Sequence, residues 1–206
     1  MSAIHILPIH FFAQKDTLWL ARDLLGKILT THFEGKETSG RIVETEAYLG
    51  ETDRASHAFG GRRTARTETM YLPGGHAYVY LCYGIHHLFN IVTHQMNIPH
   101  AILIRALEPM NGIPFMMERR NKIKLDYTLT RGPGSLSQAM GIHFSQSGRL
   151  LQQPELFIAD DGFRYKDDLI VSSPRIGVDY GGDDAKLPYR FFVKDNQHVS
   201  GKKIKT

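Results

Sequence analysis

The chain has 206 residues, 42% hydrophobic and 22% charged, and its 25 Lys and Arg against 21 Asp and Glu permit an anionic partner without requiring one. Its single cysteine, Cys82, excludes an internal disulfide and a cysteine-rich zinc site. No apolar run approaches the length of a membrane span and the first residues lack the pattern of a signal peptide, so we expect a cytoplasmic protein with no membrane contact.

The N-terminal part of the chain predicts a helix followed by two strands. Residues 16–26 have the pattern of a helix, for which Asp16 or Thr17 would provide the cap. Residues 27–33 and 39–49 are rich in β-branched side chains and are separated by a polar turn. We expect these two strands to be neighbours.

The middle of the chain predicts a hairpin. Residues 76–93 favour strands on both sides of Tyr83 and Gly84, which places Tyr83 near the tip, and residues 100–107 predict a further strand. A tyrosine at a tip has no neighbour across the sheet, so its exposure calls for an explanation. One explanation is a wedge that enters stacked bases of DNA.

The second half of the chain adds short helices and more strands. Pro114 suits the first turn of a helix, and Ser135 is expected to cap a second helix that ends at Gly141. Because strands come mostly in adjacent runs, we expect a mixed α+β fold built on an antiparallel sheet. The expected organisation is a single domain over residues 1–206, with a frayed N-terminus and a basic tail at 201–206. The remaining predicted strands are at 155–161, 167–178 and 189–195.

Residues 41–50, RIVETEAYLG, carry acidic groups within a predicted strand. If side chains alternate between faces, Val43, Thr45 and Ala47 share a face that could lie on a core. Two carboxylates on the opposite face leave open whether Glu46 is a solvated surface acid or is held in a cleft. That opposite face carries Ile42, Glu44, Glu46 and Tyr48.

Carboxylate and imidazole groups are concentrated at residues 44–61, which makes a metal-dependent hydrolase one hypothesis. It is the weaker hypothesis, because no HExxH motif or helical histidine pair is present. No GxSxG motif, Walker loop or dinucleotide fingerprint occurs either. The groups that could form such a site are Glu44, Glu46, Asp53 and His57.

Three basic clusters, at 60–67, 118–124 and 201–206, together make a polyanionic partner plausible. The turn at 130–134, TRGPG, precedes a predicted helix. It could hold a phosphate through backbone N–H groups or be purely structural.

Several segments together resemble the 3-methyladenine (alkyladenine) DNA glycosylase family, over about Leu20 to Gly201. The resemblance implies a curved antiparallel sheet flanked by helices, with a protruding hairpin. It also implies a monofunctional glycosylase that flips an alkylated or deaminated purine out of double-stranded DNA and hydrolyses its N-glycosidic bond. No cofactor or metal and no strand cleavage are expected, and we expect a monomer. The segments are RIVETEAYLG, DRASHAFGGRRTART, HAYVYLCYGIHHLFNI, ILIRALEP and SSPRIGV…YRFFVKDNQHVSG.

The resemblance implies roles for residues of the base pocket. Glu46 matches the general base that activates water, and Arg105 matches an arginine near that water and the DNA backbone. Tyr48, His57 and Tyr80 match the side chains that line the pocket and stack on the flipped base. We therefore expect Glu46 to be held in a cleft.

Three further residues match contacts around the pocket. Asn90 matches a pocket-floor residue that disfavours guanine by crowding its exocyclic amine. Tyr83 matches the residue that fills the space vacated in the duplex, and Arg62 is expected to contact a phosphate. The alternative from another class is a module that binds damaged or distorted DNA without chemistry, with affinity that depends on salt.

Overall fold

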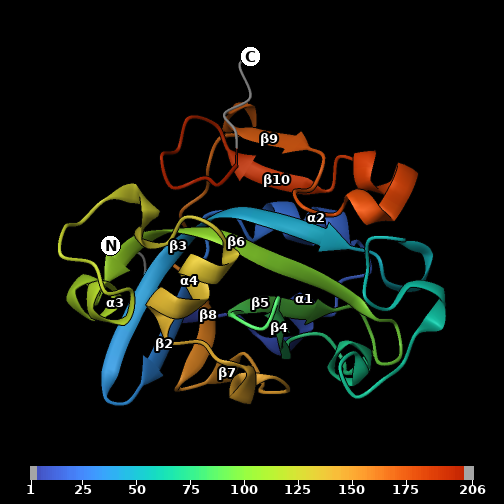
Figure 1. The fold of residues 1–206 in the computed structure, drawn as a ribbon, viewed down its shortest axis with the longest axis horizontal. Coiled ribbons are helices and arrows are strands. Elements are labelled where there is room, and N and C mark those ends of the chain that lie inside the picture. The colour runs from blue at the N-terminus through green and yellow to red at the C-terminus, as the bar shows by residue number, and fades with distance from the viewer. Residues whose placement is uncertain (1–3, 202–206) are drawn as a thin grey trace.

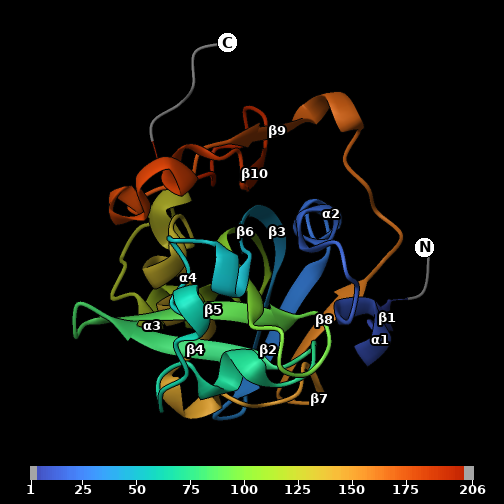
Figure 2. The ribbon, with the colours of Figure 1, turned by 90° about the vertical axis from the view of Figure 1, so that its right-hand side faces the viewer.

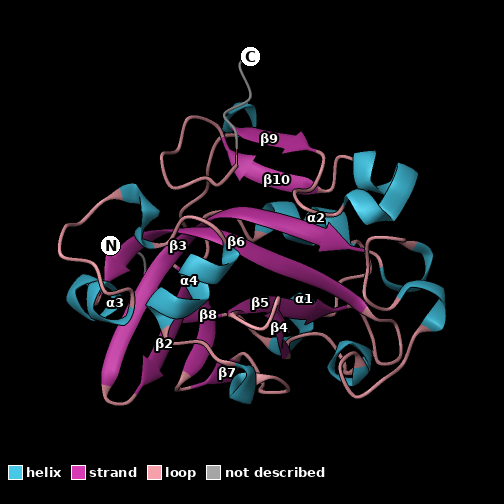
Figure 3. Ribbon diagram, viewed as in Figure 1, coloured by secondary structure: helices cyan, strands magenta, loops and turns pink. Residues whose placement is uncertain are grey.

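The computed structural model describes residues 4–201, and one antiparallel sheet of ten strands dominates it (Figures 1 and 3). The strand order is β1-β8-β2-β3-β6-β5-β4, while β7 pairs with β8 and β10 joins β3 to β9. The predicted mixed α+β fold is confirmed; the predictions for residues 1–3 and 202–206 lie outside the described residues. The strands are β1 (His5–Ile6), β2 (Ile28–Phe33), β3 (Lys36–Tyr48), β4 (Ala77–Cys82), β5 (His86–Thr93), β6 (His100–Asn111), β7 (Gln152–Gln153), β8 (Leu156–Asp160), β9 (Ile170–Ser173) and β10 (Arg190–Val193).

The helices are short and flank the sheet. Residues of α2 and α4 join the sheet residues in the main core cluster. None of the helices in residues 4–201 is long and apolar enough to cross a membrane. The α-helices are α1 (Ile9–Phe12), α2 (Thr17–Asp23), α3 (Ile113–Arg119) and α4 (Pro133–Met140). The 3₁₀ helices are η1 (Gly50–Thr52), η2 (Phe59–Gly61), η3 (Glu68–Tyr71), η4 (Tyr127–Leu129), η5 (Phe144–Gln146), η6 (Asp167–Leu169) and η7 (Asp179–Lys186).

Helix boundaries follow the capping chemistry, with one correction. The Asp16 carboxylate accepts a 2.9 Å hydrogen bond from the Trp19 backbone N–H and caps α2, as predicted. The predicted cap at Ser135 is wrong, because α4 begins at Pro133 with Gly132 as its N-cap. Proline suits a first helical turn, where its missing N–H costs no hydrogen bond, so the helix starts three residues earlier than predicted.

The two longest strands, β3 and β6, slip by one residue in the middle of their pairing. Val43 on β3 and Arg105 on β6 have no residue directly opposite, and the register is the same before and after this slip. Irregularities of this kind re-aim side chains and are frequent beside active sites. The pairs around the slip are Ile42 with Leu107, Glu44 with Ala106, and Thr45 with Ile104.

The slip decides which side chains of β3 reach the main core. Ile42 and Ala47 belong to the main core cluster, whereas Val43 packs with Ala106 and Val193 in a separate small cluster. This corrects the sequence prediction, in which regular alternation placed Ile42 with the glutamates and Val43 with the core. An extra residue reverses the phase of the alternation, so the glutamates that follow it avoid the main core.

The hairpin of β4 and β5 projects from the molecule, toward the left in Figure 2. Its turn is closed by a 3.1 Å hydrogen bond from the Ile85 N–H to the Cys82 carbonyl. Tyr83 and Gly84 both have positive φ, 50° and 72°, which is the geometry of a type I′ hairpin turn. Tyr83 lies at the tip as predicted, and 91% of it is exposed.

Candidate active site

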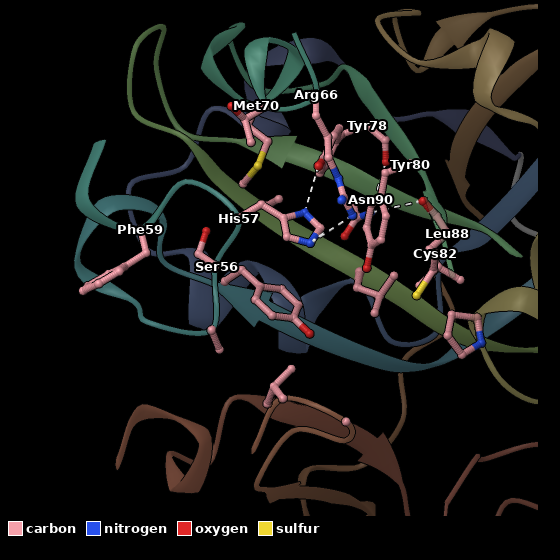
Figure 4. Close-up of a pocket in the computed structure, with 18 of the residues that line it drawn as sticks. Ser56, His57, Phe59, Arg66, Met70, Tyr78, Tyr80, Cys82, Leu88 and Asn90 are labelled. Atoms are coloured by element: carbon pink, nitrogen blue, oxygen red, sulfur yellow. Dashed lines mark hydrogen bonds between the residues drawn. The ribbon is translucent and has the colours of Figure 1, made fainter. Parts of the chain in front are cut away.

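A pocket of about 890 Å³ lies where strands β3 to β6 meet the loops around residues 54–70 and 176–180 (Figure 4). Aromatic side chains form much of its wall. The charged side chains that line it are all arginines, and no Asp, Glu or Lys of the described chain lines it. The aromatic and imidazole groups are Tyr48, His57, Phe59, Tyr78, Tyr80, Tyr83 and Tyr180, and the arginines are Arg54, Arg62, Arg66 and Arg105.

Glu46 lies fully buried directly behind the pocket wall. Its Oε2 accepts a 2.8 Å hydrogen bond from the Tyr48 hydroxyl and lies 3.2 Å from Nη1 of Arg105. Its Oε1 accepts a 2.8 Å hydrogen bond from the Ile176 N–H. All three neighbours are donors, as an ionised carboxylate requires, and all three residues line the pocket.

Glu44 is the second buried acid, and it holds Arg105 from the other side. Its Oε1 accepts from Nε of Arg105 at 3.0 Å and from Nε of Arg190 at 2.7 Å. The Ser200 N–H and hydroxyl donate to the two Glu44 oxygens at 2.7 and 3.0 Å. These hydrogen bonds of Glu44 are all to other groups of the protein, and Glu44 does not line the pocket. This fits a structural role for Glu44 beside the pocket.

The Arg105 guanidinium joins the two glutamates. Besides these contacts, its Nη2 donates to the Ser200 hydroxyl at 3.1 Å. Burial lowers the pKa of Arg105, but the charges of Glu46 and Glu44 outweigh burial and hold that pKa above its ordinary value. Arg105 is thus a fixed cation between two carboxylates, with one side open to the pocket.

Tyr48 contributes its ring to the pocket and its hydroxyl to Glu46. Burial, followed by the nearby Glu46 charge, raises the pKa of Tyr48 well above its ordinary value. The hydroxyl therefore stays protonated at physiological pH and serves as a donor.

His57 lies between Tyr78 and Arg66 (Figure 4). Its Nδ1 is 2.9 Å from the Tyr78 hydroxyl, and its Nε2 is 3.5 Å from Nη2 of Arg66. Burial, with smaller contributions from the charges of Arg66 and Arg62, lowers the pKa of His57 to about 4. Arginine can only donate, so the imidazole is neutral with Nε2 as acceptor and an Nδ1 proton directed at Tyr78.

The guanidinium of Arg66 lies over the aromatic ring of Tyr80. The guanidinium carbon of Arg66 lies 5.2 Å from the centre of the Tyr80 ring, and the His57 ring meets the same tyrosine edge-on at 4.6 Å. A base that stacks on Tyr80 would therefore encounter the Arg66 charge. Arg66 belongs to the basic cluster at 60–67, but nothing in that cluster distinguished it from its neighbours.

Asn90 is buried on β5, and its amide nitrogen donates to the carbonyls of Tyr78 and Leu88 at 3.1 and 3.3 Å. These bonds fix the side chain in the pocket lining (Figure 4).

The structure brings together the eight residues singled out from the sequence. Seven line the pocket, namely Tyr48, His57, Arg62, Tyr80, Tyr83, Asn90 and Arg105, and the eighth, Glu46, lies behind it.

Three of the four groups considered for a metal site form ion pairs with arginines. Glu44 and Glu46 contact Arg105, while Asp53 pairs with Arg175. Within residues 4–201, no three side chains of His, Cys, Asp and Glu are grouped so that they could hold a metal ion. The three carboxylates are thus engaged by arginine side chains.

The family model and the most similar relatives that we compared indicate the same protein family. The sequence matches the model of the methylpurine-DNA glycosylase family over residues 10–197, which include the whole pocket lining. It is 44% identical over 189 residues to a Chlamydia abortus protein named "Putative 3-methyladenine DNA glycosylase", covering 91% of this chain and 98% of that protein. Proteins of the same name from Chlamydia pneumoniae and Clostridium acetobutylicum are 45% and 44% identical, over 190 and 199 residues. These cover 91% and 93% of this chain, and 95% and 96% of those proteins.

Proposed function

The chain belongs to the methylpurine-DNA glycosylase family, and we propose that it flips alkylated or deaminated purines out of duplex DNA and hydrolyses their N-glycosidic bonds. Water is the nucleophile and the product is an abasic site. The observation that carries this proposal is Glu46, a buried carboxylate held by three donors directly behind an aromatic pocket.

Breaking an N-glycosidic bond builds positive, oxocarbenium-like charge on the sugar. A fixed carboxylate beside the sugar can take a proton from the attacking water and stabilise that charge at the same time. Arg105 and the Ile176 N–H hold the Glu46 oxygens in place, so no reorganisation is needed when the charge develops. Glu46 is the general base of this mechanism.

The target purine must first leave the duplex, which costs a few kcal/mol and costs least at damaged or mispaired bases. In this proposal Tyr83 fills the space left behind, which its exposure at the tip of the protruding hairpin supports. The extruded base would then stack among Tyr48, His57 and Tyr80. We propose that Arg62, an exposed residue of the pocket lining, contacts a phosphate.

The composition of the pocket supports hydrolysis without strand cleavage. A lyase step needs an amine that forms a Schiff base with the sugar, and the charged side chains of the described lining are arginines. Arginine stays protonated in proteins and is not such a nucleophile. We therefore propose a monofunctional enzyme.

The test is single-turnover excision on duplexes that each carry one lesion, with hot alkali afterwards to convert abasic sites into strand breaks. The lesions are 3-methyladenine, 7-methylguanine, hypoxanthine and ethenoadenine. Lesion-dependent breaks that appear only after alkali, persist in chelator and vanish in Glu46→Gln support the proposal. Tight binding with no abasic sites on any duplex would indicate a recognition module without chemistry, and breaks without alkali would indicate a lyase.

A further inference from the structure

Arg175 is a buried arginine that lies between β9 and η7, beside the pocket but outside its lining. Its Nη1 donates to the Ala47 carbonyl at 2.9 Å and to Oδ2 of Asp53. Its Nη2 donates to Oδ1 of Asp53 at 2.8 Å and to the Asp184 carbonyl at 3.0 Å. One guanidinium therefore ties the end of β3 to the loop after it and to η7.

The same guanidinium stacks on the ring of Tyr48. Its central carbon lies 4.7 Å from the centre of that ring and 5.3 Å from the centre of the Tyr189 ring. A buried cation over an aromatic face is attracted to it and limits the rotation of the ring. The ring that Arg175 holds in this way carries the hydroxyl that donates to Glu46.

The peptide bond after Arg175 supplies the second donor. Its nitrogen is the Ile176 N–H, which donates to Oε1 of Glu46. Two of the three donors to Glu46 thus depend on Arg175. The Tyr48 hydroxyl depends on it because Arg175 stacks on the Tyr48 ring, and the Ile176 N–H depends on it because Ile176 is the next residue of the chain. The third donor, Arg105, is held separately by Glu44.

Asp53, the partner of Arg175, is also buried, and it accepts hydrogen bonds from the backbone of the loop that follows β3. Its carboxylate accepts the Leu49 N–H and the Ala55 N–H, each at 3.0 Å. That loop leads directly to His57 in the pocket wall. The Arg175–Asp53 pair therefore fixes the loop and the Tyr48 ring relative to each other.

We propose that Arg175 is a positioning residue that sets the geometry of the Tyr48 hydroxyl and the Ile176 N–H on Glu46. Its effect falls on the rate of glycosidic bond hydrolysis and not on the affinity for the damaged duplex. This inference rests on the proposed function, in which Glu46 is the general base.

The test compares Arg175→Lys with wild type in single-turnover excision at saturating enzyme, and in affinity for a lesion duplex in the Glu46→Gln background. Lysine keeps the charge but loses the bidentate pair with Asp53 and the planar stack on Tyr48. Because misplacing a catalytic group by about 1 Å costs on the order of 100-fold, we expect the excision rate to fall about 10- to 100-fold. The dissociation constant should change by less than about threefold, a small change on the scale of about 1.4 kcal/mol per factor of ten.

Arg41→Lys is the matched control. Arg41 also forms a bidentate pair, with Asp161 at 3.1 and 2.7 Å, and also stacks on an aromatic ring, that of Phe163 at 4.3 Å. It lines no part of the pocket. Arg41→Lys should therefore lower thermal stability in the manner of Arg175→Lys while leaving the excision rate of the folded protein unchanged.

A double-mutant cycle with Tyr48→Phe separates positioning from general damage. If Arg175 acts partly through the Tyr48 hydroxyl, Arg175→Lys costs a smaller factor in the Tyr48→Phe background than in wild type. Equal factors in both backgrounds, or an unchanged rate in folded Arg175→Lys, would overturn the inference while wild-type excision upheld the proposed function. Absence of wild-type excision would overturn both. If Arg175→Lys does not fold, Asp53→Asn takes its place, with the same rate loss expected and an unchanged rate again overturning the inference.

Discussion

The Tyr48 hydroxyl donates a 2.8 Å hydrogen bond to Glu46, which lies two residues earlier on the same strand. Alternate residues of a strand share a face, so both side chains leave β3 in the same direction. The tyrosine reaches the pocket and the glutamate stays behind it. One side chain therefore forms the wall against which a base could lie and also orients the carboxylate proposed to act on the sugar.

The two buried glutamates should respond differently to neutralisation. Glu46→Gln keeps the shape of the side chain but cannot accept a proton, so we expect single-turnover excision to fall by roughly 10²- to 10⁴-fold. Affinity for a lesion duplex should stay within a few-fold of wild type. Fluorescence anisotropy with labelled duplexes measures this affinity, and joint loss of binding and excision would instead assign Glu46 a structural role.

Glu44→Gln is the comparison for that experiment. It removes a charge that two buried arginines and Ser200 share. Because breaking a buried ionic network leaves uncompensated charge, we expect a loss of about 3 kcal/mol in the free energy of unfolding. Urea unfolding measures it, and an undiminished free energy of unfolding would contradict this account of the network.

Tyr83→Ser should weaken binding to a damaged duplex without destabilising the protein. The side chain is 91% exposed, so its removal costs the folded state little. Aromatic stacking on bases contributes about 1–3 kcal/mol, which predicts a loss of affinity of about 5- to 150-fold. Trp19→Ser, at an exposed aromatic residue of α2 outside the pocket, is the control and should bind as wild type does. Equal affinities for Tyr83→Ser and wild type would remove the wedge from the mechanism.

Arg66→Gln should change the preference between cationic and neutral bases. The Arg66 charge lies over the Tyr80 ring, where it opposes a positively charged base such as 7-methylguanine more than a neutral one such as hypoxanthine. A cation–π interaction contributes about 0.5–2 kcal/mol. We therefore expect the ratio of 7-methylguanine to hypoxanthine excision to rise by up to about tenfold.

The control for Arg66 is its neighbour Arg63, which pairs with Glu68 and does not line the pocket. Arg63→Gln should leave the ratio of the two excision rates unchanged. If Arg66→Gln lowers both rates by the same factor, Arg66 contacts the DNA backbone and does not discriminate between bases.

Acidification should destabilise the protein from about pH 6.5 downward. Burial lowers the pKa of His57 to about 4, with smaller contributions from Arg66 and Arg62, and burial also lowers the pKa of His100 to about 4. Between the folded and unfolded pKa values the unfolded chain binds more protons, so stability rises with pH in this window and is lost as pH falls. His57 alone accounts for about 3 kcal/mol by pH 4.

Urea unfolding at pH 7, 5.5 and 4.5 measures this loss. His57→Gln should show a shallower pH dependence than wild type, because it removes one of the two histidines whose pKa is lowered to about 4. An identical dependence in wild type and His57→Gln would show that His57 is not buried in its neutral form.

The longer strands and the hairpin were predictable because their signals are local, whereas the two-residue strands β1 and β7 were not predicted and the strand predicted at 167–178 spans only Ile170–Ser173. β-Branched runs and the Tyr83–Gly84 turn lie within a few residues of the structure they produce. The slip between β3 and β6 was not predictable, because no glycine or proline marks Val43 or Arg105, and the face of Ile42 was consequently wrong. The start of α4 was wrong because serine is a favoured capping residue, yet Ser135 lies inside the helix that Pro133 begins.

Recognition of the site depended on the family resemblance, and the structure shows what local patterns omit. Arg175 and Ser200 lie in the last of the segments that carry the resemblance, but no local pattern predicted their contacts, since their partners lie far away in sequence. Ser200 contacts Glu44 across 156 positions, and Arg175 contacts Asp53 across 122. Only the folded sheet brings these groups together, whereas the roles assigned to Glu46, Asn90 and the other pocket residues remain predictions.

Val43 and Arg105 are insertions in the middle of the ladder between β3 and β6, which has one further irregularity at Ser39 and Gly40. The register is the same on both sides of them, and Ile42 before the insertion and Ala47 after it both reach the main core. The guanidinium that joins the two glutamates is thus carried by a residue that the hydrogen-bond ladder does not require. In this sheet the two glutamates occupy paired positions of the ladder, whereas the cation between them is supplied at an unpaired one.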